Sequence, residues 1–225
     1  MKQLLLAVLV FGIAHTLTAQ TETSRVTPPF QPAEARSVTD IRYNPCGVPG
    51  IVVLYALISE SGEVQEVEVR RNIACLTQIA VQAVKGWKFS PATFAGKAIA
   101  SRIPVAVTFE SQSSAPNPFP LPKPVPQTAA AVQAEFQPVE VTRAGLPPFH
   151  PGYAFAEGTV ALEVTVGAKG EVEVIKVLRD IPPFTANAKA VVGDWQFMPA
   201  TFNGRPVPSK ILLAFVSPPF VTNGP

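Results

Sequence analysis

Few side chains in this chain are of the types that perform catalysis or bind metals. The histidines are His15, which follows an apolar N-terminal run, and His150, and the cysteines are Cys46 and Cys75. So few ligands form no His/Cys metal cluster, and two bridged cysteines would leave no thiol nucleophile. A Ser-His-acid triad around His150 would need partners that only the fold could bring together. The sequence therefore predicts no catalytic residue, no metal site, no cofactor and no enzymatic activity.

The charged residues do not point to a nucleic-acid partner. The chain has 18 Lys and Arg against 16 Asp and Glu, a net charge of +2, and its basic residues are scattered. A nucleic-acid binder gathers its basic residues into a patch. Glu63, Glu66 and Glu68 lie along a predicted hairpin strand, where a solvated face explains them. The glycines match neither a phosphate loop nor a dinucleotide fingerprint.

The N-terminus has the layout of a secretory signal peptide over residues 1–19. Lys2 is followed by an apolar run over residues 4–14 and then by "HTLTAQ", with cleavage expected after Ala19. An uncleaved inner-membrane anchor is the alternative. However, about eleven apolar residues at about 1.5 Å each reach roughly 16 Å of a hydrocarbon core about 30 Å thick. We expect a periplasmic or cell-envelope protein that contacts a membrane only if this segment is kept.

Export has a consequence for the two cysteines. Thiols oxidise and pair outside the cytoplasm, so we expect a disulfide between Cys46 and Cys75. Closing this loop would stabilise the fold by about 3 kcal/mol in the chain-entropy model. Two unbridged core cysteines are the alternative.

The chain repeats itself. "GWKFSPATFAGK" begins at Gly86 and "DWQFMPATFNGR" at Asp194, and a shift of 108 positions keeps the register from Gly50 to about Glu110 without an insertion. "FQPAEA" at Phe30 and "FQPVEV" at Phe136 extend both copies upstream. Repeats of this kind are copies of one structural unit. The domain organisation follows: a first copy over 26–110, a Pro-rich linker over 111–133 and a second copy over 134–220.

Every second residue from Pro116 to Pro126 is proline. Proline fixes its own φ and disfavours helix in the residue before it, so this stretch is predicted to be extended. At about 3.1 Å a residue it would hold the two copies roughly 34 Å apart. A ligand for a proline-recognition domain is the alternative role.

Within each copy the hydrophobic pattern alternates with a period of two and then changes to a helical one. In copy two the alternation predicts a strand with Thr159, Glu163 and Thr165 on its polar face, followed by a turn and a returning strand. The step from Val64 to Val67 in copy one indicates a bulge in the returning strand. The apolar face of the second-copy strand comprises Val160, Leu162, Val164 and Val166.

Copy one differs in that its first strand is apolar on both faces, which predicts cover on both sides, with the segment around Cys46 as the candidate for the second cover. The residues on its second face are Ile51, Val53, Tyr55 and Leu57.

An amphipathic helix follows in each copy, and then the repeated aromatic phrase and a last apolar strand. The predicted class is α+β: two tandem ββαβ domains, each an antiparallel sheet with one helix packed on it. Large aromatic residues at the end of such a helix are predicted to fill the core, together with Phe94 and Phe202. Gly96 and Gly204 are predicted to supply turn geometry. The structural motif comprises Trp87, Phe89, Pro91 and Ala92 in copy one and Trp195, Phe197, Pro199 and Ala200 in copy two.

With this hairpin, helix, Trp-x-Phe-x-Pro-Ala segment and final strand, each copy resembles the C-terminal domain of TonB-type energy transducers. The resemblance implies a periplasmic domain that grips an extended segment of a partner protein, such as a TonB-dependent outer-membrane receptor, by strand addition. The chain departs from a full transducer, because its N-terminal segment is predicted to be cleaved and its Pro-rich stretch lies between two such domains. Without an anchor it could not transmit force.

The final strands are the predicted binding sites, because an edge strand exposes unpaired backbone groups. Pro104 favours an edge position but removes one donor, which copy two keeps at Leu212. Copy two is therefore predicted to be the better acceptor. The alternative is that these edges are blunted or pair with one another in a dimer. The candidate residues are Ile103, Val105 and Val107 in copy one and Ile211, Leu213 and Phe215 in copy two.

Three functions follow from these predictions. The first is an exported tandem adaptor for extended protein segments, the second an anchored energy transducer for outer-membrane transport, and the third a structural envelope protein that forms a homodimer.

Overall fold

Both copies fold into the same succession of strands around one helix. The computed structural model describes residues 30–41, 48–110, 119–120, 136–147 and 157–217. Copy one comprises β1 (Phe30–Gln31), β2 (Glu34–Ser37), β3 (Gly50–Ile58), β4 (Val64–Arg71), α1 (Thr77–Lys85), β5 (Lys88–Ser90), β6 (Ala92–Phe94), β7 (Lys97–Ile99) and β8 (Ser101–Phe109). Copy two comprises β10 (Phe136–Gln137), β11 (Glu140–Ala144), β12 (Gly158–Val166), β13 (Val172–Arg179), α2 (Phe184–Val192), β14 (Gln196–Met198), β15 (Ala200–Phe202), β16 (Arg205–Val207) and β17 (Ser209–Ser217). The predicted α+β class, with two helices and mostly antiparallel sheets, is confirmed.

The local geometry of the hairpins agrees with the sequence pattern. The register between β3 and β4 shifts where Leu57 faces Glu66 and Ile58 faces Val64, which is the predicted bulge. Gly62 has a φ of +85°, and a β-carbon there would lie 2.0 Å from the backbone oxygen of Phe89. Glycine is therefore required in this turn because the chain bends sharply and β5 passes close by.

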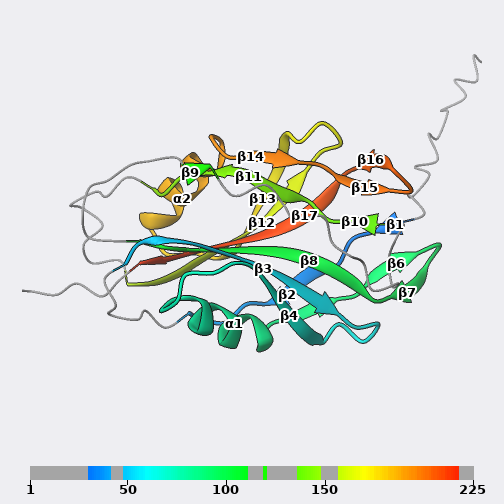
Figure 1. The fold of residues 1–225 in the computed structure, drawn as a ribbon, viewed down its shortest axis with the longest axis horizontal. Helices are drawn as coiled ribbons and strands as arrows, with labels where there is room; N and C mark the ends of the chain where they lie inside the picture. Colours follow the sequence, from blue (N-terminus) through cyan, green and yellow to red (C-terminus); the bar gives the residue numbers. More distant parts are fainter. Residues whose placement is uncertain (1–29, 42–47, 111–118, 121–135, 148–156, 218–225) are drawn as a thin grey trace, which may run out of the picture.

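The two copies share one sheet. Six long strands lie in the order β13-β12-β17-β8-β3-β4, and among the described strands the only parallel pair joins β17 to β8. This pair runs from Leu212 opposite Val105 to Val216 opposite Phe109. It begins one position after Pro104, which has no N–H to donate. Figure 1 shows the two central strands side by side between the halves.

One continuous core follows from this sheet. Buried residues of both copies form a single hydrophobic cluster. The prediction of independent cores is therefore wrong, and so is that of a spacer that holds the copies roughly 34 Å apart. The physical reason is that β8 and β17 are apolar on both faces, as strands are when sheet neighbours and covering layers surround them. Of the linker, the structure describes only β9 (Phe119–Pro120), which pairs with the end of β11.

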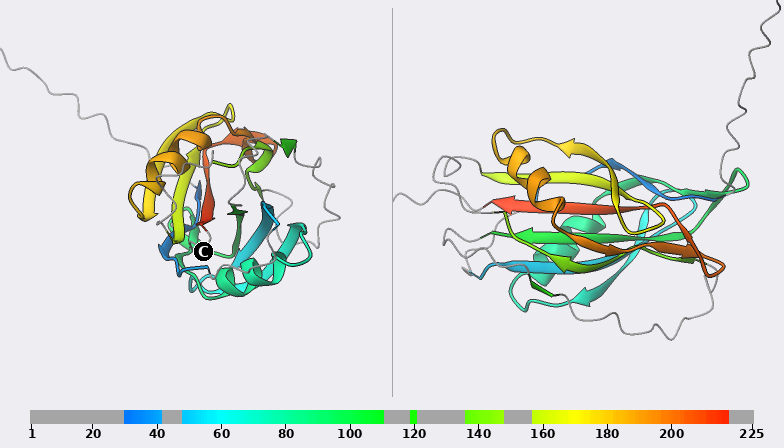
Figure 2. Two further views of the ribbon diagram at one scale, coloured as in Figure 1. Left: turned by 90° about the vertical axis from the view of Figure 1, so that its left-hand side faces the viewer. Right: turned by 90° about the horizontal axis from the view of Figure 1, so that it is seen from above.

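The parallel pair also decides which face of the sheet each copy covers. Leu213 lies opposite Leu162 and Ala106, and Ala106 lies opposite Val53. Directly paired residues point to the same face, so Leu162 and Val53 share a face of the sheet. Because corresponding faces of the two copies are thereby reversed, α1 packs on one side and α2 on the other, as Figure 2 shows.

The upstream segments cross between the copies. We call residues 30–41 leader one and residues 136–147 leader two. The backbone N–H of Ala35 in leader one donates to Glu163 of β12, and that of Ile41 donates to Thr159, both at 2.9 Å. In the opposite sense, Tyr55 of β3 donates to Glu140 of leader two at 3.3 Å. Each leader therefore covers the sheet of the other copy.

This exchange corrects one prediction and bears on a second. Thr159 and Glu163 were expected on a polar outer face, but they are 0% and 2% exposed, because leader one lies over them. The second face of β3 is covered as predicted, and the segment that contacts Tyr55 there is leader two; the segment around Cys46 lies outside the described residues. A pattern of alternation shows that a face is covered without showing which segment covers it.

The repeated aromatic phrase is mainly architecture. Its tryptophan and first phenylalanine are buried in both copies, as predicted, and so are Ala92 and Ala200; Pro91 and Pro199 are half-buried. Gly96 and Gly204 have positive φ in their turns. The core prediction is wrong for Phe94, which is 40% exposed. The buried aromatic residues of the repeated phrase are Trp87, Phe89, Trp195 and Phe197.

Candidate protein-binding surfaces

The final strands, predicted as open edges, are the two central strands of the sheet. Each is hydrogen-bonded on both sides, β8 to β3 and β17, and β17 to β12 and β8. The prediction of an edge is therefore wrong. The final strands do pair with one another, as in the alternative, but they do so within one chain rather than in a dimer. Binding of a partner along them stays a prediction, and it would require β8 and β17 to separate. All six candidate residues are buried: Ile103, Val105, Val107, Ile211, Leu213 and Phe215.

A buried polar cluster joins leader one to copy two. Glu163 accepts the Ala35 N–H and, at 3.0 Å, a hydrogen bond from Lys210, which also donates to Glu34 of leader one. The Lys210 bond lowers the pKa of Glu34. Burial acts to lower the pKa of Lys210, but the two carboxylates outweigh it and raise that pKa. The cluster satisfies each buried charge and fixes leader one in register.

Replacing Glu163 tests this cluster. Glu163→Ala leaves the Ala35 N–H without its acceptor and Lys210 with one carboxylate fewer. Truncating one member of such a buried cluster costs about 2–4 kcal/mol of unfolding free energy, measured by urea denaturation. Lys176→Met is the matched control, since Lys176 is half-exposed and 3.7 Å from Glu163. A Glu163→Ala variant no less stable than Lys176→Met would contradict the assignment.

Copy one joins leader two through a different set of side chains. Tyr55, at the position that corresponds to Glu163, donates to Glu140, and the Arg70 guanidinium lies 5.2 Å from the Tyr55 ring centroid. Burial raises the pKa of Tyr55, and Glu140 adds to this effect. Burial also raises the pKa of Glu140. At this one position of the repeat, copy one thus contacts the opposite leader through a phenol, and copy two does so through a carboxylate.

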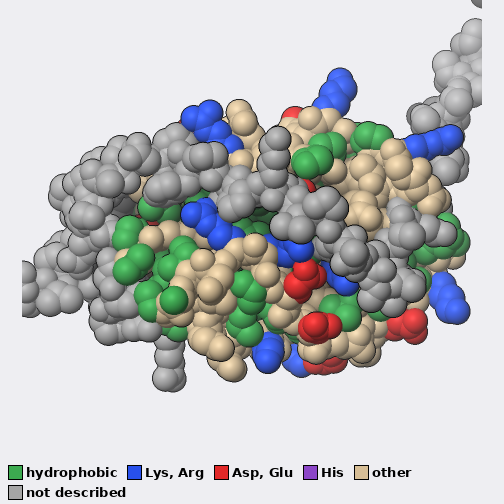
Figure 3. Space-filling model, viewed as in Figure 1, with side chains coloured by type: hydrophobic (Ala, Val, Ile, Leu, Met, Phe, Trp, Pro, Cys, Tyr) green, Lys and Arg blue, Asp and Glu red, His purple; other side chains and the backbone are tan. Residues whose placement is uncertain are grey.

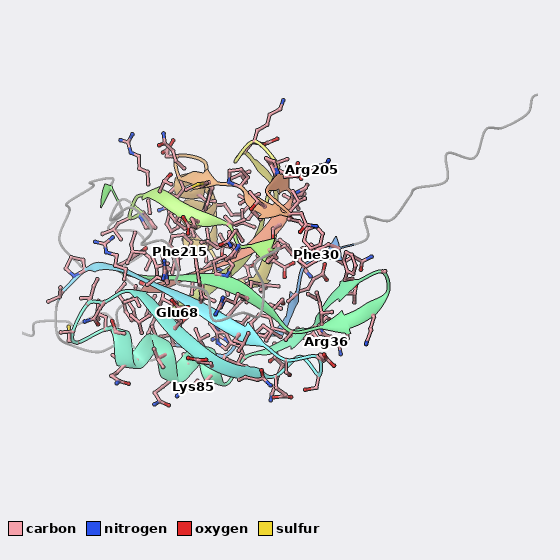
Figure 4. The ribbon with its side chains drawn as sticks, turned by 45° about the vertical axis from the view of Figure 1, so that its right-hand side comes forward. Phe30, Arg36, Glu68, Lys85, Arg205 and Phe215 are labelled. Carbon is pink, nitrogen blue, oxygen red and sulfur yellow. The ribbon has the colours of Figure 1, made fainter. Side chains whose placement is uncertain are left out.

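Four phenylalanines meet at one end of the molecule. Phe30 of leader one lies 4.5 Å from Phe136 of leader two and 5.8 Å from Phe202, and Phe94 lies 5.5 Å from Phe202, all between ring centroids. Figure 1 places β1, β10 and the hairpins β6–β7 and β15–β16 at this end, and Figure 4 labels Phe30 and Arg205 on the same side of the molecule, away from Phe215. The repeated Phe-Gln-Pro and Ala-Thr-Phe phrases therefore contact one another across the two copies.

A cavity of about 290 Å³ opens beside these rings. Leader one contributes Phe30 and Pro32, and copy two contributes Thr165, Phe202, Val207 and Pro208. At the position of Thr165, copy one has the larger Leu57. The cavity is nearly apolar and large enough for one bulky side chain.

The outer edges of the six-stranded sheet are β4 and β13. Among the residues that the structure describes, neither strand has a strand neighbour along its outer side, although β5 forms an antiparallel bridge at Glu63, one residue before β4. Val69 on β4 and Val174 and Val177 on β13 are 41%, 55% and 37% exposed. An edge of this length offers backbone donors and acceptors and apolar side chains to an added strand. Sequence reasoning missed these edges, although valines interleaved with charged residues along both strands were a usable signal.

The remaining predicted residues are only partly within the described chain. Cys75 is disulfide-bonded, while Cys46, His150 and the N-terminal segment lie outside the described residues. Within the described ranges, no group of three or more His, Cys, Asp or Glu could hold a metal ion. No helix in those ranges is long and apolar enough to span a bilayer.

Comparison with known proteins gives one family. The family model described as "Gram-negative bacterial TonB protein C-terminal" matches residues 46–111 and 154–216, over half of the chain. Each match begins between the leader and the first long strand of one copy and runs into or past the end of its last strand. No curated protein and no solved structure matches the chain.

Proposed function

Because the chain belongs to the family of Gram-negative bacterial TonB protein C-terminal domains, we propose that it binds extended segments of partner proteins in the cell envelope by adding them as strands to β4 or β13. Domains of this family are non-catalytic and interact with proteins such as TonB-dependent receptors. Such a receptor is the partner class that we propose.

One observation carries the choice of edge. Among the described strands of the six-stranded sheet, only β4 and β13 are hydrogen-bonded on one side, whereas β8 and β17 are bonded on both. A strand added to β4 or β13 gains main-chain hydrogen bonds without displacing anything described. A strand added to β8 or β17 would first have to break the continuous core.

Peptide titration tests this proposal. We expect a neutral Thr-Val alternating peptide to shift backbone amide signals of β4 or β13 in the NMR spectrum of the labelled full-length protein. The same peptide with N-methyl groups on alternate residues is the matched control, since it cannot donate the ladder hydrogen bonds. Amide shifts centred on β8 and β17, or equal binding of the N-methylated peptide, would contradict the proposal.

Export and oxidation complete the proposal. We place the mature protein in the periplasm, with residues 1–19 removed and Cys46 bridged to Cys75. The sequence of the mature N-terminus separates this adaptor from an anchored transducer: a start near Gln20 is expected, and a retained Met1 in the inner membrane would favour the transducer. Mass measurement before and after reduction and alkylation tests the disulfide.

A further inference from the structure

The two outer edges carry different charges at equivalent positions. On β4 the face under leader two presents Glu66 and Glu68, which lie opposite Leu57 and Tyr55. On β13 the corresponding face presents Val174 and Lys176, opposite Thr165 and Glu163. The duplication has therefore kept both strands and changed what each would offer to an added strand.

The first half of the β4 edge is acidic on one face and apolar on the other, and the acidic face ends in Arg71, opposite Val53. Glu66 is exposed, and Glu68 is half-buried and forms an ion pair with Arg70 at 2.9 Å. Glu140 of leader two accepts a hydrogen bond from Tyr55 on the same face. The other face carries Val67 and Val69. Figure 3 shows the acidic side chains of this view mostly in its lower half, where Figure 1 places β4 and its hairpin.

An added strand must match both faces, because its side chains alternate between them. Residues opposite Glu66 and Glu68 would face the acidic side, and the intervening residues would cover Val67 and Val69. Opposite charges in directly paired positions stabilise a strand pair, and like charges destabilise it. Cationic residues therefore suit the first set of positions and branched apolar residues the second.

We propose that the β4 edge selects an extended segment that alternates Lys or Arg with Val, Ile or Thr. This inference rests on the proposed function, since it assigns a ligand class to one of the two edges. The basic residues of the ligand lie opposite the Glu66–Glu68 half of the strand. The other half ends in Arg70 and Arg71 and contributes backbone hydrogen bonds.

The net charge of the whole protein makes the proposal distinctive. Because the protein carries a net charge of +2, long-range attraction would favour an acidic peptide over a basic one. A preference for the basic peptide must therefore come from side chains close to the bound strand. It should also weaken as salt is added, since the pairs are partly exposed.

The test compares two peptides of equal length, one alternating Lys with Val and the other Glu with Val. Both are titrated into the full-length protein at low salt and followed by amide shifts. The Lys-Val peptide is expected to bind on the order of tenfold more tightly and to perturb β4, given two favourable pairs in place of two unfavourable ones. In a Glu66→Gln/Glu68→Gln variant the preference should fall to about twofold or less. Glu173→Gln on β13 is the matched control and should leave the preference unchanged.

The outcomes separate this inference from the proposed function. Equal affinities, a tighter Glu-Val peptide, Lys-Val shifts confined to β13, or an unchanged preference in the double variant would overturn the β4 assignment while leaving strand addition in place. If these peptides and the neutral Thr-Val peptide all fail to perturb β4 and β13, strand addition falls and the inference falls with it.

Discussion

Residues 134–220, produced without copy one, are expected to form a homodimer rather than a folded monomer. Removing copy one takes away β8, the parallel neighbour of β17, and leader one, which covers β12. Burial of each large apolar side chain such as Leu213 or Phe215 is worth roughly 1.5–3 kcal/mol, so the isolated copy would gain by covering them again. A second molecule can do this, because its β17 and leader two have the same form as the missing segments.

The polar contacts allow this exchange as well. Glu140 of leader two corresponds to Glu34 of leader one, so in the homodimer it could accept a hydrogen bond from Lys210 of the other molecule, which also donates to Glu163 there. Analytical ultracentrifugation measures the outcome, with the full-length chain as control. Mixing 26–110 with 134–220 should give a heterodimer. A stable, folded monomer of either fragment at micromolar concentration would show that the copies are independent.

Phe215→Ala is expected to destabilise both copies together. The Phe215 side chain is fully buried on a central strand, with its ring centroid 6.0 Å from that of Trp195. Truncating a buried phenylalanine costs about 3–5 kcal/mol, a large fraction of the stability of an ordinary domain. Because the core is continuous, copy one should lose its structure in the same transition.

Two tryptophans allow this to be measured. In Trp195→Phe and Trp87→Phe backgrounds, the remaining indole reports on copy one or copy two during urea unfolding. Phe215→Ala should move both transitions to lower urea by the same amount, whereas Val177→Ala on an outer edge should change the unfolding free energy by less than about 1 kcal/mol. A Trp87 transition that does not move would contradict the single core.

The sequence predicted what depends on local pattern. The repeat in register, the alternation of Val160, Leu162 and Val164, and the odd spacing of Val64 and Val67 report on backbone geometry within one copy. The structure has the corresponding hairpins and bulge. The buried positions of Trp87 and Trp195 also followed, because a large aromatic residue on an apolar helical face has few other places to go.

The arrangement of the two copies did not follow from those patterns. A strand that is apolar on both faces, such as β17, must be covered, but its pattern names neither its neighbour nor its covering layer. Ile211 and Leu212 are both buried, and this unbroken apolar run was the signal against an edge. Glu163 was read as solvated because alternation cannot show that the backbone of leader one lies over it.

The most direct test of a shared sheet is a measurement of nuclear Overhauser effects between β8 and β17 in the full-length protein in solution. The parallel register predicts cross-peaks between backbone protons of Val105 or Ala106 and those of Leu212 or Leu213. The amides of these residues should exchange with solvent only when the whole protein unfolds. Absence of these cross-peaks, with fast exchange of the amides on the facing sides of both strands, would contradict it.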